Sequence, residues 1–233
     1  MVDPAEKSTQ VRERAPAFAE VADGVLLDGR LALFHNEQKW MAVSDLHFGY
    51  EVSRRQDGGL WPMWGMDTIE NRLRELIESF QPEQLILLGD IVDSAAAAPE
   101  AIEWMTRIFD LCPDLVLIAG NHDRGAVKRK FPFVSSHQVD GFFFHHGHQN
   151  EPVPDACVEI TGHYHPSVSF ADGAGTRLRL PTLAMERCPE TSLEKWTMPA
   201  FSPWAGGYRY SAQFPSGEVR QFACSLQRVF EIE

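Results

Sequence analysis

The sequence is poor in cysteine and contains no long hydrophobic run. Its four cysteines lie far apart and form no Cys-x-x-Cys pair, which argues against a zinc knuckle or a disulfide framework and fits a reducing compartment. No apolar run approaches the ~18–20 residues that span a bilayer, and the first residues are too polar for a signal peptide. We therefore expect a cytoplasmic protein without membrane association.

Basic residues are also scarce. The chain has 21 Lys and Arg against 33 Asp and Glu, which gives a formal net charge of −12. Because nucleic-acid backbones are normally bound by a basic footprint, this balance counts against an extended nucleic-acid surface. It does not exclude a local basic patch beside bound divalent cations, which bring positive charge of their own.

A length of 233 residues with 44% hydrophobic residues fits one large domain with a sizeable core. Residues 1–20 show no clear periodicity, so we expect a loosely ordered N-terminal arm followed by a single domain over residues 21–233. The dipeptide Asp28-Gly29 between two apolar runs predicts a β-hairpin. Residues 48–66 are expected to form a long loop.

The first half of the chain alternates between two kinds of apolar pattern. Helical spacing predicts helices over 67–80 and 99–111, and continuous apolar runs predict strands over 40–43, 84–88 and 115–119. This order is typical of parallel strands covered by helices. After Arg124 the pattern changes to short strands, so we expect an α/β fold with a second, mixed or antiparallel sheet stacked on the first and further helices outside it.

Side chains that can bind metals follow these apolar runs. Seven of the nine histidines lie in or beside such stretches: His47, His122, His145, His146, His148, His163 and His165. Packing alone would not place them together at the ends of apolar runs. The same stretches add oxygen donors from Asp45, Asp90 and Asn121.

The spacing of these donors predicts one metal centre. On an extended chain, the i, i+2 pairs Asp45/His47 and His163/His165 would each point to one side. Asp90 could bridge two cations, whereas spacing alone cannot choose a ligand among the three histidines at 145–148. Oxygen and imidazole donors without thiolate suit Mn, Fe or Zn, and two metals that share a carboxylate are the usual apparatus for attack on a phosphorus ester.

The motifs that carry these residues resemble, in order, the five motifs of the calcineurin-like metallophosphoesterases. They are Asp45-x-His47, Gly89-Asp90-x-x-Asp93, Gly120-Asn121-His122-Asp123, His146-Gly147-His148 and Gly162-His163-x-His165. The resemblance implies a four-layer α/β/β/α sandwich of two mixed sheets with a dinuclear metal site at strand ends. It also implies which residues hold each metal: Asp45, His47, Asp90 and His165 for one, and Asp90, Asn121, His146 and His163 for the other.

The same resemblance implies that His122 is a general acid or a phosphate-orienting group that an acidic neighbour, Asp93, keeps in place. Ser94 stands where the protein-phosphatase branch carries Arg, which argues against a phosphoprotein phosphatase. Looser signatures, among them the stretch Met198–Gly207, resemble the PdeM group, the ligase-associated DNA damage response endonucleases related to the SbcD-type nucleases. That likeness implies Mn-dependent DNA cleavage within a DNA repair system that contains a ligase or helicase.

Four residues are candidates for substrate binding, namely Arg54, Arg55, Trp61 and Arg124. Arginine together with an aromatic residue often holds single-stranded nucleic acid, although a loop fixed by its tryptophans with solvated arginines gives the same pattern. Arg124 begins a basic run that equally suits a solvated face. The leading hypothesis is a phosphodiesterase acting on DNA; a hydrolase of nucleotides or other small phosphoesters and an inactive scaffold are the alternatives, and the oligomeric state is left open.

Overall fold

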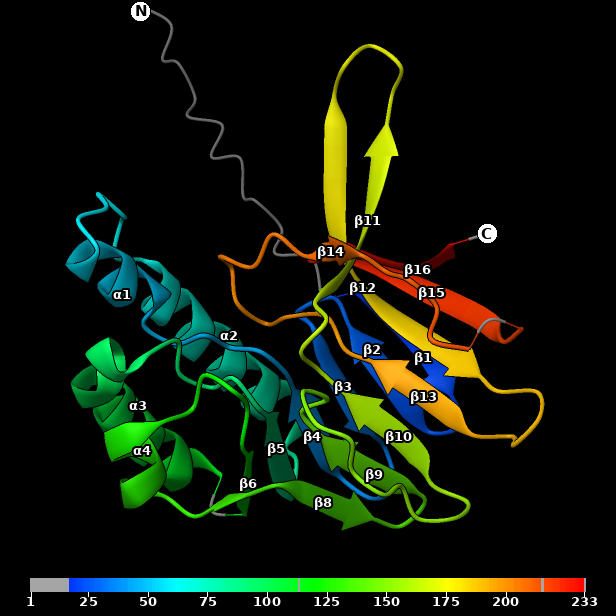
Figure 1. Ribbon diagram of the computed structural model, residues 1–233, viewed down its shortest axis with the longest axis horizontal. Coiled ribbons are helices and arrows are strands. Elements are labelled where there is room, and N and C mark those ends of the chain that lie inside the picture. The colour runs from blue at the N-terminus through cyan, green and yellow to red at the C-terminus, as the bar shows by residue number, and fades with distance from the viewer. Residues whose placement is uncertain (1–16, 113, 215, 233) are drawn as a thin grey trace, which may run out of the picture.

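The first of two β-sheets is built almost entirely from the N-terminal half of the chain. The computed structural model describes residues 17–112, 114–214 and 216–232, and Figure 1 shows their arrangement. Seven strands follow one another in chain order: β1 (Phe18–Ala22), β2 (Val25–Asp28), β3 (Ala32–His35), β4 (Trp40–Val43), β5 (Gln84–Leu88), β6 (Leu115–Ile118) and β7 (Phe133–Val134). β1 to β4 pair antiparallel, and β4 to β7 pair parallel. The predicted hairpin at Asp28-Gly29 is confirmed, because β2 pairs with β3 across it.

The expected N-terminal arm falls mostly on residues outside the described part of the chain. Its last residues belong to β1, which pairs with β2 from Phe18 onward. The sheet thus begins before residue 21, at an edge strand of which Val21 is buried and Phe18 and Glu20 are exposed.

Helices cover one face of the first sheet (Figure 1). They are α1 (Tyr50–Gln56), α2 (Gly65–Phe80), the short 3-10 helix η1 (Ala95–Ala97), α3 (Ala98–Leu111) and α4 (Gly125–Lys130). α2 buries Ile69, Leu73 and Leu76, whose helical spacing predicted it. The prediction of a long loop over residues 48–66 was wrong in part, because α1 occupies the start of that segment. None of the described helices is long and apolar enough to cross a membrane.

The second half of the chain forms the second sheet. Its strands are β8 (Ser136–Val139), β9 (Phe142–His145), β10 (Val158–Thr161), β11 (Pro166–Ala171), β12 (Arg177–Arg187), β13 (Glu194–Thr197), β14 (Tyr208–Arg209), β15 (Glu218–Ser225) and β16 (Arg228–Ile232). Their order is β14-β11-β12-β13-β10-β9-β8, with β15 between β12 and β16. Three strand pairs are parallel, namely β9–β10, β10–β13 and β11–β14. The other pairs are antiparallel, so the second sheet is mixed as expected.

Aromatic side chains from both sheets form the centre of the core. Trp40 of β4 makes edge contacts with Phe142 and Phe144 of β9, at ring-centroid distances of 5.0 and 5.1 Å. Trp40, Phe144 and Trp196 are fully buried. The apolar inner faces of the two sheets therefore pack on each other, which is the usual way in which a two-sheet domain buries its core.

The expected outer layer of helices on the second sheet is not found among the described residues, whose helices all lie between residues 50 and 130. Irregular segments connect the strands there instead. The crossover from β9 to β10 contains Pro152 and Pro154, which remove backbone donors and disfavour a helix. Over β12, the backbone N–H groups of Gln213 and Phe214 donate to buried Glu186, so a loop covers part of that face.

Candidate metal centre

The loops that carry the candidate ligands leave the carboxyl ends of neighbouring parallel strands. β4, β5 and β6 are followed by Asp45, Asp90 and Asn121, and β9 and β10 are followed by His146 and His163. Backbone hydrogen bonds join the loops: the His47 N–H donates to Asp90 O at 2.9 Å, and the Gly162 N–H donates to His146 O at 3.1 Å. Ligands of α/β sheets collect at this edge, which here is shared by both sheets.

Five of these residues have left-handed backbone conformations. The φ angles are 53° for Asp45, 45° for His47, 45° for Asp90, 68° for His163 and 44° for His165. The prediction that the two i, i+2 pairs lie on extended chain was therefore wrong. Non-glycine residues in this region are uncommon and strained, and they concentrate at functional sites where the surrounding structure holds them.

The first cluster of donor atoms contains Asp45, His47 and His165, whose ligand-type atoms lie within 4.8 Å of one another. His165 Nε2 lies 3.0 Å from Asp45 Oδ1. Both ring nitrogens of His47 are buried without a hydrogen-bond partner, and its Nδ1 lies 3.5 Å from Asp93 Oδ1. Since buried polar groups are almost always satisfied, a ring nitrogen of His47 without a partner fits a role as a metal ligand.

The second cluster contains Asp90, His146 and His163. His146 Nε2 lies 3.3 Å from Asp90 Oδ2 and 3.3 Å from Asn121 Oδ1. Its other nitrogen, Nδ1, lies 3.1 Å from the carbonyl oxygen of Leu88, which can only accept a hydrogen. That contact fixes the ring so that Nε2 faces the donor cluster, an arrangement common among metal-binding histidines.

Electrostatics couple this histidine to the carboxylates. Burial by itself would lower the pKa of His146, but the hydrogen bond to Asp90 and the charges of Asp45 and Asp90 raise it to about 9. Burial by itself would raise the pKa of Asp90, yet the contacts with His146 and His122 hold it well below its usual range. The carboxylates thus stay ionised and supply the negative charge that a cation would neutralise.

Asp90 joins the clusters into one centre. A third group of donor atoms contains His47, Asp90 and His122, so Asp90 lies within reach of residues from both of the other clusters. This is the position that a bridging carboxylate would occupy. His148 belongs to none of the three groups, which separates it from His146, the neighbour that spacing alone could not exclude.

His122 lies at the mouth of the centre. Its backbone N–H donates to Asp90 Oδ1 at 2.8 Å, and its Nδ1 lies 2.8 Å from the backbone carbonyl oxygen of Asp93. The Asp93 carboxylate instead faces His47. The expectation that the Asp93 side chain steadies His122 was therefore wrong in its detail: the backbone of Asp93 makes that contact, because the turn after Asp90 directs the carboxylate toward the first cluster.

Asp123, which had no assigned role from the sequence, ties two ligand loops together. Its Oδ1 accepts hydrogen bonds from the backbone N–H groups of Ile91 and Val92, each at 3.0 Å, and its Oδ2 accepts one from Gly120 at 2.9 Å. Burial raises the pKa of Asp123, and the three donated hydrogen bonds oppose that rise. The loop that carries Asp90 and the loop that carries Asn121 are thus joined by one side chain.

Two motif glycines are required by the closeness of the ligands. A Cβ atom on Gly89 would overlap the ring of His146, and Gly89 also has a φ of 74°. A Cβ atom on Gly120 would overlap the backbone nitrogen and the carboxylate of Asp90. A side chain at either position would displace a candidate ligand, so the glycines serve the geometry of the centre.

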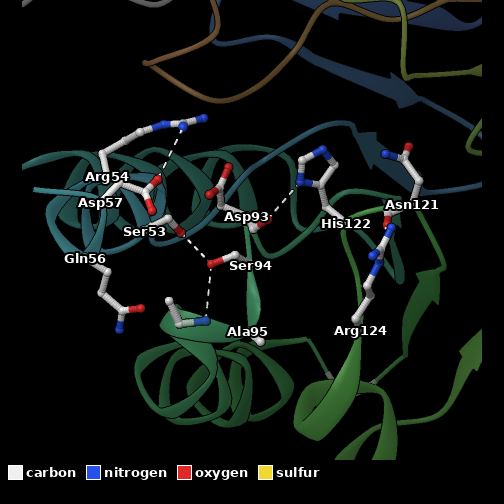
Figure 2. Close-up of a pocket in the computed structure, with 11 residues that line it drawn as sticks. Ser53, Arg54, Gln56, Asp57, Asp93, Ser94, Ala95, Asn121, His122 and Arg124 are labelled. Carbon is white, nitrogen blue, oxygen red and sulfur yellow. Dashed lines mark hydrogen bonds and ion pairs between the residues drawn. The ribbon is translucent and has the colours of Figure 1, made fainter. Parts of the chain in front are cut away.

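A cavity of about 470 Å³ opens beside His122 (Figure 2). Arg54 and Arg124 line it, as do Asn121 and Asp93. Two of the four predicted substrate residues therefore lie at the centre, and both bring positive charge. Ser94 bonds to Ser53 and caps η1 through the Ala96 N–H, so the residue that replaces Arg has a local structural role.

The other two predicted substrate residues, Arg55 and Trp61, do not line the described cavities at the centre. Arg55 Nε donates to the Trp61 carbonyl oxygen at 2.7 Å and so closes the loop after α1. The Trp61 ring packs edge-on against Tyr50 and Trp204, at 5.3 and 5.2 Å. For these two residues the structure therefore agrees with the alternative interpretation, in which they fix the loop and do not bind substrate.

A second cavity, of about 490 Å³, shares Arg54, Asp93 and His122 with the first and is lined by aromatic residues that were not among the predicted site residues. Tyr50, Trp204 and Tyr208 line it together with His47 and other residues of the centre. Trp204 Nε1 donates at 3.0 Å to the fully buried carboxylate of Glu51, which also accepts from the Met66 N–H. Trp204 lies in the stretch Met198–Gly207 that resembles the PdeM group, whereas no periodicity or motif marks Tyr50 or Tyr208. A distant segment brings Trp204 and Tyr208 to the site.

Two mixed sheets with a cluster of histidines, carboxylates and an amide at their strand ends define a metal-dependent phosphoesterase fold. The chain belongs to the calcineurin-like phosphoesterase family, whose sequence profile matches residues 39–187. Among solved structures, Pseudomonas putida nuclease MPE is similar with a TM-score of 0.66 and 24% identity, over 93% of this chain and 100% of that chain. Yfce, a phosphoesterase from E. coli, has a TM-score of 0.46 and 16% identity, over 83% of this chain and 97% of that one. No curated protein matches the chain.

Proposed function

We propose that this protein is a phosphodiesterase that uses two divalent metal ions. The observation that carries the proposal is the convergence of three donor groups on Asp90 and its neighbours. One ion would be held by Asp45, His47, Asp90 and His165, and the other by Asp90, Asn121, His146 and His163. Bound there, the ions would neutralise charge on the phosphoryl oxygens and activate water. The mixed oxygen and imidazole donors suit Mn, Fe or Zn, and the resemblance of the motifs favours Mn among them.

The residues around the ions would complete the chemistry. A carbonyl oxygen only accepts, so Nδ1 of His122 donates to Asp93 O and Nε2 would be the nitrogen available for proton transfer to the substrate. His122 lines both cavities, where it would protonate the leaving oxygen or orient the phosphate. Arg54 and Arg124 would attract the phosphate from the first cavity. We also propose that the expected domain over residues 21–233, extended at its start to include all of β1, acts as one unit, which the continuous hydrophobic core supports.

Within this activity we propose DNA as the substrate. The similar fold of a Pseudomonas nuclease and the two arginines beside the centre support a nucleic-acid substrate with a local basic contact. The formal net charge of −12 favours the second candidate, a hydrolase of nucleotides or other small phosphoesters. A role in DNA repair beside a ligase or helicase is a further proposal that rests on the resemblance of the motifs alone.

Substrate panels separate the two candidates. Purified protein is incubated with Mn and tested on bis-p-nitrophenyl phosphate, p-nitrophenyl phosphate, and labelled single- and double-stranded DNA. The proposal predicts turnover of the diester and cleavage of DNA, both of which Asp90→Asn abolishes; Asp110→Asn on the exposed face of α3 serves as the control. Rapid monoester turnover without DNA cleavage would favour the small-molecule hydrolase. Metal binding without turnover of any substrate would favour an inactive scaffold.

A further inference from the structure

Two exposed tyrosines flank the histidines that close the candidate metal centre. The side chain of Tyr208 is 71% exposed and its ring centroid lies 6.5 Å from that of His165. Tyr164 is 42% exposed and its ring packs edge-on against His163 at 5.2 Å. Large aromatic side chains left in solvent beside a phosphoester site offer planar surfaces that the fold itself does not use.

These rings line a third cavity, which we call the tyrosine cavity. Its volume is about 370 Å³, and it is lined by His163, Tyr164, Tyr208, Arg209, Tyr210, Ser211 and Gln213. His163 also belongs to the donor cluster with Asp90 and His146, so this cavity begins where the second metal ion would be held. Aromatic planes, one guanidinium and the polar groups of Ser211 and Gln213 are the side chains that bind a flat heterocycle with polar edges.

Hydrogen bonds to the buried carboxylate of Glu186 hold the wall of the tyrosine cavity in place. The Tyr210 hydroxyl donates to Glu186, and the same carboxylate accepts from the backbone N–H groups of Gln213 and Phe214 at 2.9 Å each. The backbone N–H of Tyr208 donates to His165 O at 2.8 Å. The buried carboxylate of Glu186 is thereby satisfied, and the tyrosines are tied to the loop that carries His163 and His165. A wall fixed in advance loses little conformational entropy when a ligand binds.

We propose that the tyrosine cavity binds the base of the nucleotide whose phosphate lies at the metal centre, with the base stacked on Tyr208 and Tyr164. This inference rests on the proposed function and extends it, because it predicts that the site prefers a nucleotide to a phosphoester without a base. The negative phosphate would lie among the ligands of the second cluster, and the adjoining nucleoside would extend past His163 into the cavity. Arg209 lies beside the base, where a guanidinium can stack or donate hydrogen bonds.

Inhibition constants test the base contact directly. With methyl p-nitrophenyl phosphate as the reporter substrate and Mn present, inhibition is measured for thymidine 5′-phosphate and for 2-deoxyribose 5-phosphate, in which a hydroxyl group replaces the base. We expect thymidine 5′-phosphate to bind roughly tenfold more tightly, as stacking of one base predicts. Tyr208→Ala and Tyr164→Ala should each reduce this ratio toward one, whereas Tyr208→Phe should retain it.

Three outcomes would overturn the inference. The wild-type protein could show equal inhibition by the two compounds, or Tyr208→Ala could leave the ratio unchanged. Alternatively, Tyr208→Ala alone could reduce the ratio while Tyr164→Ala does not, which would place the base in the cavity beside Trp204. Phe170→Ala, which removes a partly exposed ring on β11 outside the tyrosine cavity, is the control and should retain the ratio. If the reporter is not hydrolysed by the wild type, the proposed function fails before the base contact is reached.

Discussion

Replacing Asp123 by Asn tests how strongly one side chain holds the centre together. The wild-type carboxylate accepts three backbone hydrogen bonds, two on Oδ1 and one on Oδ2. An asparagine can place its oxygen toward Ile91 and Val92, but its NH₂ group then faces the Gly120 N–H, so two donors oppose each other. The flipped amide would oppose the other two donors. At least one buried N–H is therefore left unsatisfied in either orientation.

The expected cost follows from that count. An unsatisfied buried donor costs about 1–3 kcal/mol, and the remaining hydrogen bonds lose the strength that a charged acceptor gives them, so we expect a total loss of about 2–4 kcal/mol of unfolding free energy. This is a large part of the ~5–15 kcal/mol that stabilises a typical domain. Metal affinity should fall as well, because Asp123 joins the loops that carry Asp90 and Asn121.

The loss of unfolding free energy is measured by urea unfolding with tryptophan fluorescence as the signal, since the chain has six tryptophans. Wild type, Asp123→Asn and the exposed control Asp110→Asn are compared with and without Mn. The control should lie within about 0.5 kcal/mol of wild type. If Asp123→Asn is equally stable and binds Mn with unchanged affinity, the hydrogen bonds of Asp123 do not hold the two loops together.

Three further perturbations address other parts of the molecule. His122→Ala should lower turnover by roughly 10²–10⁴-fold with metal content unchanged, and loss of metal in this variant would show that His122 is a ligand. Gly162→Ala should lower metal content, because its Cβ would overlap Ser44 and Asp45; full metal occupancy would show that the close approach is unimportant. Arg107 is the main cause of the lowered pKa of Glu70, so the stability that Glu70 adds is present above its ordinary pKa of 4.5 and is lost as the pH falls through its lower folded value. The difference in unfolding free energy between wild type and Glu70→Gln should therefore shrink below about pH 4.5. A difference that grows as the pH falls would contradict a lowered pKa of Glu70.

Regular apolar patterns made parts of the fold predictable. The strands β4 and β5 have the predicted bounds, because buried parallel strands are continuous apolar runs. The helix α1 was missed because only Glu51 and Ser53 are buried along it, so it has no apolar stripe. The helix α4, which contains the basic run after Arg124, was missed for the same reason. It has six residues and buries only Val127, so it has no apolar stripe either.

The positions of the candidate ligands were predictable, but their backbone geometry was not. Motif order and strand ends indicated that Asp45, Asp90 and His146 would meet, and the structure brings them together. The left-handed conformations of Asp45 and Asp90 leave no sequence mark, because tertiary hydrogen bonds impose them on residues that are not glycine. The aromatic residue Tyr208 was missed because it reaches the centre through pairing of β14 with β11, which local sequence patterns do not reveal.

Metal binding and diester hydrolysis, measured on the same preparation, test the central claim most directly. Metal-stripped protein is titrated with Mn while bound metal per chain and hydrolysis of bis-p-nitrophenyl phosphate are both followed. Two shared-ligand sites predict two ions per chain, with diesterase activity that appears as they bind, and Asp90→Asn should lose both properties. Full activity in Asp90→Asn, or absence of diester hydrolysis with Mn, Fe and Zn alike, would contradict a dinuclear centre built on Asp90.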